Sequence, residues 1–315
     1  MFTYAIAAWR TAPGRDFRNL HCPFPPIALL IKQHHYFALN AFPTAATRTR
    51  VDLQLAGDAA LVTASSSGLG KASARALAAE GSNVVINGRN EERLAAAVED
   101  VRGDAADGAT VLGHAADLTD PDAVAELVER PVAEFGGLDH LVTSAGGPPA
   151  KPFLETTDDE WYDAFDLLVM SVVRAVRAAA PHLRADDGGT IVTIASITVK
   201  EPKPNLVLSN AVRSGVVGLE KTLSQEFAPE IRANAVLPGT HETPRIEEVV
   251  DQGVERGDYD SYDDGLEEWA DRIPIGRLGD PMELGRTVAF LSSPQSAYLT
   301  GVAVPIHGGE GASTL

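Results

Sequence analysis

The chain has 315 residues, of which 44 are acidic and 26 are Lys or Arg, giving a formal net charge of −18, and it has one cysteine. This length allows a core large enough to fold without disulfides, and no Cys/His cluster has metal-ligand spacing. The acidic surface excludes nucleic acid and anionic membranes as favoured partners, so we expect a metal-free, cytoplasmic protein that acts on a small molecule.

The charge is unevenly distributed. Residues 1–50 contain six Lys/Arg and one acid, so the acidic excess lies wholly in residues 51–315. That part has only five lysines, a composition that we expect of a salt-adapted cytoplasmic protein. An ordinary acidic protein is the alternative.

The first fifty residues have no sustained periodicity and carry prolines at positions 13, 23, 25, 26 and 43. Their longest apolar run, IALLI, is too short to cross a bilayer, and no cleavage signal follows a hydrophobic segment. We interpret 1–50 as an irregular basic extension. It is either a disordered arm or, as we favour, an untranslated stretch upstream of a start at Val51.

From residue 59 onward, short apolar runs alternate with amphipathic segments. Strands are predicted at 59–64, 83–88, 110–117, 138–147, 189–196, 231–239 and 299–306. Helices are predicted at 68–80, at 91–101, after Pro121, in a long segment ending near Pro181, from Leu208, and at 281–293. Apolar strands joined by helices indicate an α/β fold, with residues 51–315 forming a single doubly wound parallel-sheet (Rossmann-type) domain.

The segment 240–274 interrupts this pattern with an acidic, helix-prone insert that follows a strand's carboxyl end. Ligands of open α/β sheets bind at that end. The insert is either a substrate lid or a solvated surface excursion.

A glycine-rich turn follows the first strand and leads directly into a helix. It consists of Thr63, Ala64, Ser65, Ser66, Ser67, Gly68, Leu69 and Gly70. Glycines let the backbone approach a pyrophosphate, serine hydroxyls can donate to it, and the helix amino terminus offers free N–H groups. The turn in this strand–helix context predicts a dinucleotide site.

These residues resemble the short-chain dehydrogenase/reductase family, whose turn reads T-G-x-x-x-G-x-G, and the resemblance covers about residues 55–310. It is closest to 3-oxoacyl-acyl-carrier-protein reductase-like members. It implies cofactor contacts from Asp117 with Leu118, from Ser144, Ala145 and Gly146 in place of N-N-A-G, and from Pro238 and Gly239. The C-terminal segment also matches, with His307 replacing the usual Asp.

Cofactor preference is indicated by Arg89, which follows the second strand where an acid would hold the ribose hydroxyls of NAD. An arginine there can bind a 2′-phosphate. We therefore predict NADP as the preferred cofactor, with NAD as the alternative.

The family's catalytic tyrosine is absent. Counting thirteen residues from Ser196, which matches the family's serine, leads to Ser209, and Arg213 stands where the family has lysine. Leu168 occupies the asparagine position. A serine hydroxyl is a much weaker acid than a phenol, so Ser209 is a poor replacement for the tyrosine, whereas Arg213 can still bind ribose and supply positive charge.

We therefore expect a different residue to act as the proton donor in place of the tyrosine. His241, just past the Pro-Gly pair, and Lys200, just past Ser196, are the main candidates; Lys203 and Glu242 are weaker ones. Each of them could instead be an exposed loop residue.

Three functions remain open from the sequence. We favour an NAD(P)-dependent oxidoreductase acting on a small-molecule or acyl carbonyl substrate or the corresponding alcohol. The alternatives are a dinucleotide-binding regulator or inactive partner subunit, and a non-redox lyase or hydratase. The helix of residues 158–183 is apolar over much of its circumference, and the resemblance implies pairing of long helices, so we expect a homodimer or homotetramer.

Overall fold

The structure is a computed structural model that describes residues 51–185 and 188–313. The predicted extension, 1–50, lies outside the described residues. The strands are β1 Ala59–Val62, β2 Asn83–Gly88, β3 Val111–Ala115, β4 His140–Thr143, β5 Gly189–Ile194, β6 Ile231–Pro238 and β7 Ala303–Ile306. The helices are α2 Gly68–Ala79, α3 Glu91–Asp104, α4 Pro121–Phe135, α5 Asp158–Phe165, α6 Ser171–Leu183, α7 Val207–Glu226, α8 Pro244–Arg256, α9 Tyr262–Asp271 and α10 Pro281–Ser292.

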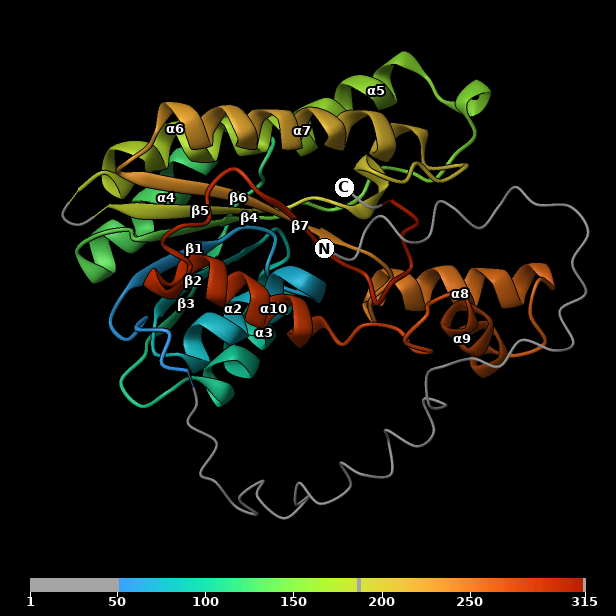
Figure 1. Cartoon of the computed structure of the whole chain (residues 1–315), viewed down its shortest axis with the longest axis horizontal. Coiled ribbons are helices and arrows are strands. Elements are labelled where there is room, and N and C mark those ends of the chain that lie inside the picture. The colour runs from blue at the N-terminus through green and yellow to red at the C-terminus, as the bar shows by residue number, and fades with distance from the viewer. Residues whose placement is uncertain (1–50, 186–187, 314–315) are drawn as a thin grey trace, which may run out of the picture. The chain divides into compact units, whose positions relative to one another are not determined.

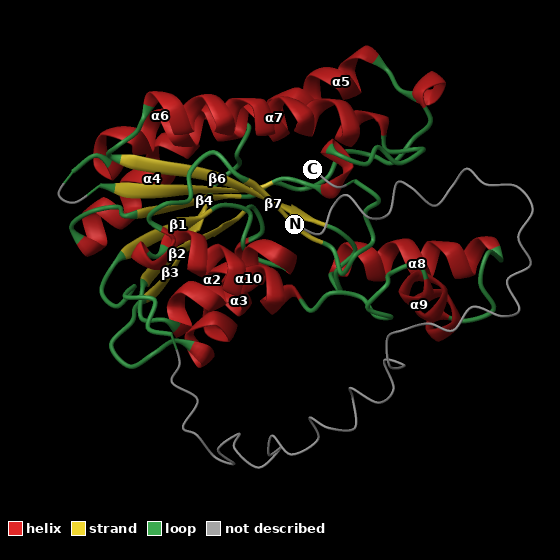
Figure 2. Ribbon diagram, in the orientation of Figure 1, coloured by secondary structure: helices red, strands yellow, loops and turns green. Residues whose placement is uncertain are grey.

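The strands form one parallel sheet in the order β3-β2-β1-β4-β5-β6-β7. Figures 1 and 2 show the sheet between two helical layers, with α4, α6 and α7 on one face and α2, α3 and α10 on the other. Each layer buries its own apolar cluster against the sheet. Side chains of β1, β4 and β5 are buried on both faces, which explains why these strands read as continuous apolar runs. The predicted doubly wound fold is confirmed.

The predicted long helix is not uniform. A π-helical turn, η4, spans Asp166–Met170 between α5 and α6. A π turn accommodates an extra residue and rotates the side chains that follow it. Leu168 lies within this turn and is 2% exposed in the apolar cluster beneath α7.

The insert after β6 forms two helices, α8 and α9, that pack on each other through Tyr259. Its ring lies against Gly253 and Gly265, and its hydroxyl accepts a hydrogen bond from Trp269 Nε1 at 3.0 Å. Figure 1 shows both helices beyond the carboxyl ends of the strands. None of the helices in the described ranges is long and apolar enough to cross a bilayer.

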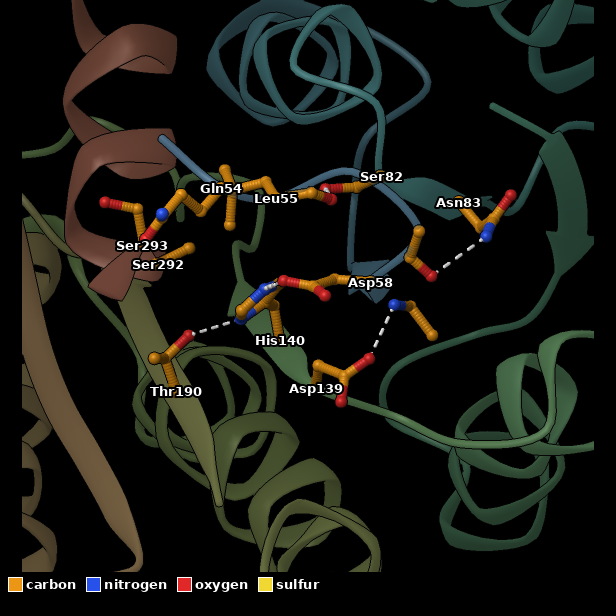
Figure 3. A network of polar contacts seen from close by, with 12 residues as sticks. Gln54, Leu55, Asp58, Ser82, Asn83, Asp139, His140, Thr190, Ser292 and Ser293 are labelled. Atoms are coloured by element: carbon orange, nitrogen blue, oxygen red, sulfur yellow. Dashed lines mark hydrogen bonds and ion pairs between the residues drawn. The ribbon is translucent and has the colours of Figure 1, made fainter. Parts of the chain in front are cut away.

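The amino end of the sheet is held by polar contacts (Figure 3). His140 is 5% exposed; its Nε2 lies 3.0 Å from an oxygen of Asp58 and its Nδ1 lies 2.9 Å from the hydroxyl of Thr190. The carboxylate of Asp139 accepts a 2.7 Å hydrogen bond from the amide of Ala59. These contacts join β1, β4 and β5 and satisfy buried polar groups, as a stable interior requires.

Candidate active site

A cavity of about 420 Å³ lies at the carboxyl ends of the strands; we call it the first cavity. Its walls come from the turn after β1, the ends of β2, β4 and β5, and parts of α7 and α8. The chain crosses from one face of the sheet to the other between β1 and β4, which is where open α/β sheets bind ligands.

The turn between β1 and α2 packs so closely that side chains are excluded. A Cβ at Gly70 would lie 2.5 Å from the carbonyl oxygen of Ala64, and a Cβ at Gly88 would lie 2.6 Å from the hydroxyl oxygen of Ser66. No side chain caps the first turn of α2, so its N–H groups remain available to an anion. The turn therefore has the shape and the donors to hold a pyrophosphate.

Most of the residues predicted to bind the cofactor line the first cavity. They are Ser66, Ser67, Gly68, Leu69, Gly70, Arg89, Asp117, Leu118, Ser144, Ala145, Gly146 and Arg213. The prediction of their roles stays a prediction, but the fold brings them to one site from five segments of the chain.

Thr63 and Ser65 lie beneath the turn and do not line the cavity. The Thr63 hydroxyl donates to the carbonyl of Ser144 at 2.7 Å and accepts from its amide at 2.8 Å. The Ser65 hydroxyl donates to Val62 and accepts from the amide of Asn87. Both hydroxyls therefore fix the cavity wall and are not free to bind a ligand.

Pro238 and Gly239 also stand outside the lining. The amide of Gly239 donates to the carbonyl of Ile306 at 2.9 Å, and a Cβ at Gly239 would lie 2.5 Å from that of His307. This pair directs the chain from β6 toward Thr243 and Pro244, which do line the cavity.

Asn87 also lines the first cavity, although it was not predicted from the sequence. It is 1% exposed; its side-chain oxygen accepts from the amide of Ala64 at 3.0 Å, and its Nδ2 donates to the carbonyls of His114 and Ala116. These bonds tie the turn to the ends of β2 and β3. The signal was a polar residue within an otherwise apolar strand, which requires buried partners.

The lining of the first cavity is basic in a strongly acidic protein. It includes four arginines and one acid among the described residues: Arg89, Arg93, Arg213, Arg245 and Asp117. Asp117 lies 3.6 Å from Arg89, and hydrogen bonds from Thr119 lower the pKa of Asp117. Such a cavity favours a ligand with several negative charges. Arg93 and Arg245 were not predicted from the sequence, because they lie at the starts of α3 and α8, which only the fold brings to one cavity.

Arg213 projects from α7 into the first cavity and is half-buried. Its guanidinium donates to the carbonyls of Ile194, Ala195 and Gly146 at 3.5, 3.3 and 3.1 Å. Burial lowers the pKa of Arg213 to about 10, and no charged neighbour contributes to that shift. Arg213 therefore remains positively charged at neutral pH. It is held by carbonyls and forms no ion pair with any residue that the structure describes.

Ser196 and Ser209 lie near this cation but do not line the cavity. Ser196 follows Ala195 and caps the short helix η5, Ile197–Val199, where its oxygen accepts from the amide of Thr198 at 3.2 Å. Ser209 is half-buried near the start of α7 and makes no side-chain hydrogen bond to any residue in the described ranges.

His241 is directed away from the first cavity. It is 3% exposed and lines a second cavity of about 270 Å³ formed with α10 and the segment after β7. Its Nδ1 lies 3.2 Å from the carbonyl of Gly239, its Nε2 has no hydrogen-bond partner among the described residues, and burial lowers its pKa. The structure therefore places His241 in the lining of the second cavity and not of the first, which gives no support to its predicted role as a proton donor in the first cavity.

The other candidate acids also lie outside the first cavity. Lys200 ends η5 and is half-buried, whereas Glu242 is exposed and its amide bonds to Gly279. Lys203 forms an ion pair with Glu310, which also accepts a hydrogen bond from the amide of Thr240. Lys203 thus links the segment after β5 to the C-terminal segment. In the part of the chain that the structure describes, no cluster of His, Cys, Asp and Glu is arranged to bind a metal ion.

Comparison with known proteins identifies the family. A sequence profile described as Enoyl-(Acyl carrier protein) reductase matches residues 63–310. The chain belongs to the short-chain dehydrogenase/reductase family. It is 30% identical over 258 residues to the 3-oxoacyl-acyl-carrier-protein reductase of Thermotoga maritima, which covers 82% of this chain and 99% of that protein.

Two solved structures are informative neighbours. L-sorbose reductase from Gluconobacter frateurii, solved with NADPH and L-sorbose, has a TM-score of 0.79 and 32% identity, covering 83% of this chain and 99% of its own. A short-chain oxidoreductase from Pseudomonas aeruginosa PAO1, described as containing an atypical catalytic center, has a TM-score of 0.76 and 33% identity, covering 82% and 99%. The Pseudomonas aeruginosa protein thus shows that a chain with this fold can be described as an oxidoreductase with an atypical catalytic center.

Proposed function

We propose that the protein is an NADP(H)-dependent reductase that converts the carbonyl group of a small-molecule or acyl substrate to an alcohol without a catalytic tyrosine. The observation that carries this proposal is Arg213, a cation without a counter-ion at the end of the first cavity formed by β4, β5 and α7. Membership of an oxidoreductase family supports the same reaction class. We also propose that the protein is cytoplasmic.

The preference for NADP rests on two arginines at one end of the cavity. Arg89 and Arg93 both line it, and Arg89 lies 3.6 Å from Asp117. A guanidinium binds a phosphate through paired hydrogen bonds, whereas ribose hydroxyls of NAD are usually held by an acid at this place. Asp117 is already engaged by Thr119 and Arg89. The arrangement supports the 2′-phosphate of NADP over NAD.

The reduction of the substrate carbonyl is proposed to take place beside Arg213. A bound reduced nicotinamide supplies the hydride that the carbonyl carbon receives. Arg213 donates hydrogen bonds to the carbonyl oxygen, and its charge stabilises the negative charge that develops there. Ser196 lies outside the cavity lining, where its oxygen accepts hydrogen bonds from the amide and the hydroxyl of Thr198, so we assign it to fixing the segment after β5 and not to binding the substrate. Solvent water then gives the proton that completes the alcohol.

Titration with NADPH, followed by its fluorescence, and oxidation of NADPH by a panel of ketones and 3-oxoacyl thioesters test this proposal. We expect NADPH to bind more tightly than NADH and at least one substrate to be reduced. Tight NADPH binding without turnover on the panel would favour the alternative, a regulator or inactive partner subunit. Failure to bind either nucleotide would reject both.

We further propose that the protein forms a homodimer, or a homotetramer built from such dimers, through α7 and the α5–α6 segment. On α7, the exposed residues Ala211, Ser214, Gly215 and Gly218 are small, and nothing lies within 4 Å of a Cβ placed at Gly218. Tyr162 and Phe165 on the neighbouring α5 are 74% and 49% exposed. Small residues on one helix allow the close approach of a second copy around a two-fold axis.

Light scattering tests this pairing. Gly218→Arg places a long charged side chain on the exposed face of α7 and is expected to give monomers or to lower the association constant at least tenfold. Gly103→Arg is the matched control, because Gly103 is also an uncrowded helical glycine but lies on α3. A monomeric parent protein, or equal effects of the two changes, would contradict the proposed interface.

A further inference from the structure

Glu220 is the one buried acidic side chain among the residues that the structure describes. It lies on α7, is 2% exposed, and faces β5. A buried carboxylate without a cation is strongly disfavoured, so such a group is normally either paired or protonated. In the described part of the chain, no cation forms an ion pair with Glu220. Burial raises the pKa of Glu220 to about 8, and the hydrogen bond from Thr193 lowers it only in part. Its resting form at neutral pH is the uncharged acid.

The partners of Glu220 are two threonines of the central strands. The Thr193 hydroxyl of β5 donates to Glu220 Oε1, and the Thr143 and Thr193 hydroxyl oxygens lie 2.6 Å apart. Thr143 and Thr193 are also paired residues in the β4–β5 ladder. Glu220 Oε2 has no hydrogen-bond partner among the described residues. The acid therefore joins α7 to the two strands whose ends form the wall of the first cavity.

Glu220 and Arg213 hold the same strand from the same helix. They are seven residues apart, two helical turns or about 10 Å along α7, and so lie on nearly the same face. Glu220 accepts from Thr193, while Arg213 donates to the carbonyls of the next two residues, Ile194 and Ala195. Two neighbouring sets of hydrogen bonds therefore hold α7 against β5. Glu220 makes the more buried one, with Thr193, and Arg213 makes the other, with Ile194 and Ala195.

Among the described residues, no charged group contributes to the pKa shift of Glu220. β6 contributes Ile231 and Ala233 to the apolar cluster that includes α7, and η4 contributes Leu168 and Val169. η5 presents Ile197 and Thr198 as its buried residues. Of the acids on η4 and α5, Asp166 pairs with Arg174 and Glu160 pairs with Lys151. The other acids of α5 are exposed, namely Asp158, Asp159 and Asp163. Ionisation of Glu220 would therefore create an unpaired negative charge inside the protein.

We propose that Glu220 is a positioning residue for Arg213, which as an uncharged acid bound to Thr193 fixes α7 against β5 and on ionisation loosens the placement of the guanidinium in the cavity. This inference rests on the proposed function where it concerns turnover. Arg213 also lines the first cavity, so a change in its position can be detected as a change in NADPH affinity without any turnover.

The test compares kcat, KM and NADPH affinity of the parent protein, Glu220→Gln and Thr193→Val between pH 6 and 9.5. In the parent, kcat is expected to fall about tenfold for each pH unit above about 8, as for loss of one essential proton. Glu220→Gln keeps an uncharged acceptor for Thr193, so it is expected to stay within about threefold of the parent at pH 7 and to lose that decline. Thr193→Val is expected to lower kcat at every pH; Thr193→Ser, which keeps the hydroxyl, should restore it.

The two proposals fail in distinguishable ways. If no substrate is reduced at any pH, the proposed function fails, and the Glu220 inference is decided by NADPH affinity, which should weaken at least threefold between pH 7 and 9 in the parent and stay constant in Glu220→Gln. A parent-like decline of kcat or affinity in Glu220→Gln would overturn the inference, because another group would then be titrating. So would a parent profile that is flat up to pH 9.5.

Discussion

Replacing Arg213 by Met is expected to lower kcat by about two to three orders of magnitude, the loss seen when one preorganised oxyanion donor is removed. Arg213 is the one cation that α7 contributes to the lining of the first cavity among the described residues, and three carbonyls hold it in place. Methionine has similar length without charge or donors. Steady-state oxidation of NADPH measures kcat and KM, and thermal unfolding with NADPH titration shows that the variant folds and binds.

Two further variants separate charge from placement. Arg213→Lys keeps the charge but loses the planar fork that spans several carbonyls, so we expect intermediate activity. Arg232→Met is the matched control: Arg232 also donates to carbonyls, those of Leu299, Ser292 and Ser293, but it does not line the first cavity. It should lose stability and keep kcat. Arg213→Met with parent-like kcat would show that the electrophile is another group.

The fold followed from the sequence because its signals are local. Apolar runs such as Ile191 and Val192 in β5, and the glycine-rich turn before α2, are dictated by burial on both faces and by backbone approach at Gly70. The cofactor-site residues were predictable for the same reason, since they follow strand ends whose order the alternation of strands and helices determines.

What the sequence did not determine depends on contacts between distant segments. His241 follows the Pro-Gly pair closely, yet it lines the second cavity and not the first. The π turn that holds Leu168 lies where the long helix packs against α7. The basic character of the cavity depends on arginines from the starts of α3 and α8, which only the fold brings to one cavity. Glu220 could have been predicted: it continues the buried positions Leu208, Val212 and Val216 at steps of four.

The buried acid also makes stability depend on pH in a direction opposite to that of most carboxyl groups. The folded-state pKa of Glu220 is about 8, above the ordinary value of 4.5. As pH rises from 4.5, the unfolded chain therefore loses this proton first while the folded protein keeps it. The folded state then binds more protons, so the free energy of unfolding falls until about pH 8 and levels off above it.

Between pH 5 and pH 8 this one group should lower the free energy of unfolding by about 4 kcal/mol, at about 1.4 kcal/mol for each pH unit. Urea unfolding at several pH values measures the decrease, and Glu220→Gln should remove it because an amide does not titrate. Glu283→Gln is the matched control: hydrogen bonding to Arg277 is the main cause that lowers the pKa of Glu283 to about 2, so Glu283 is ionised in both states throughout this window and its replacement should leave the slope unchanged. If the slopes of the parent and Glu220→Gln coincide, Glu220 is not a protonated acid in the folded protein, and its contact with Thr193 then belongs to a carboxylate that internal water or a local opening of α7 stabilises.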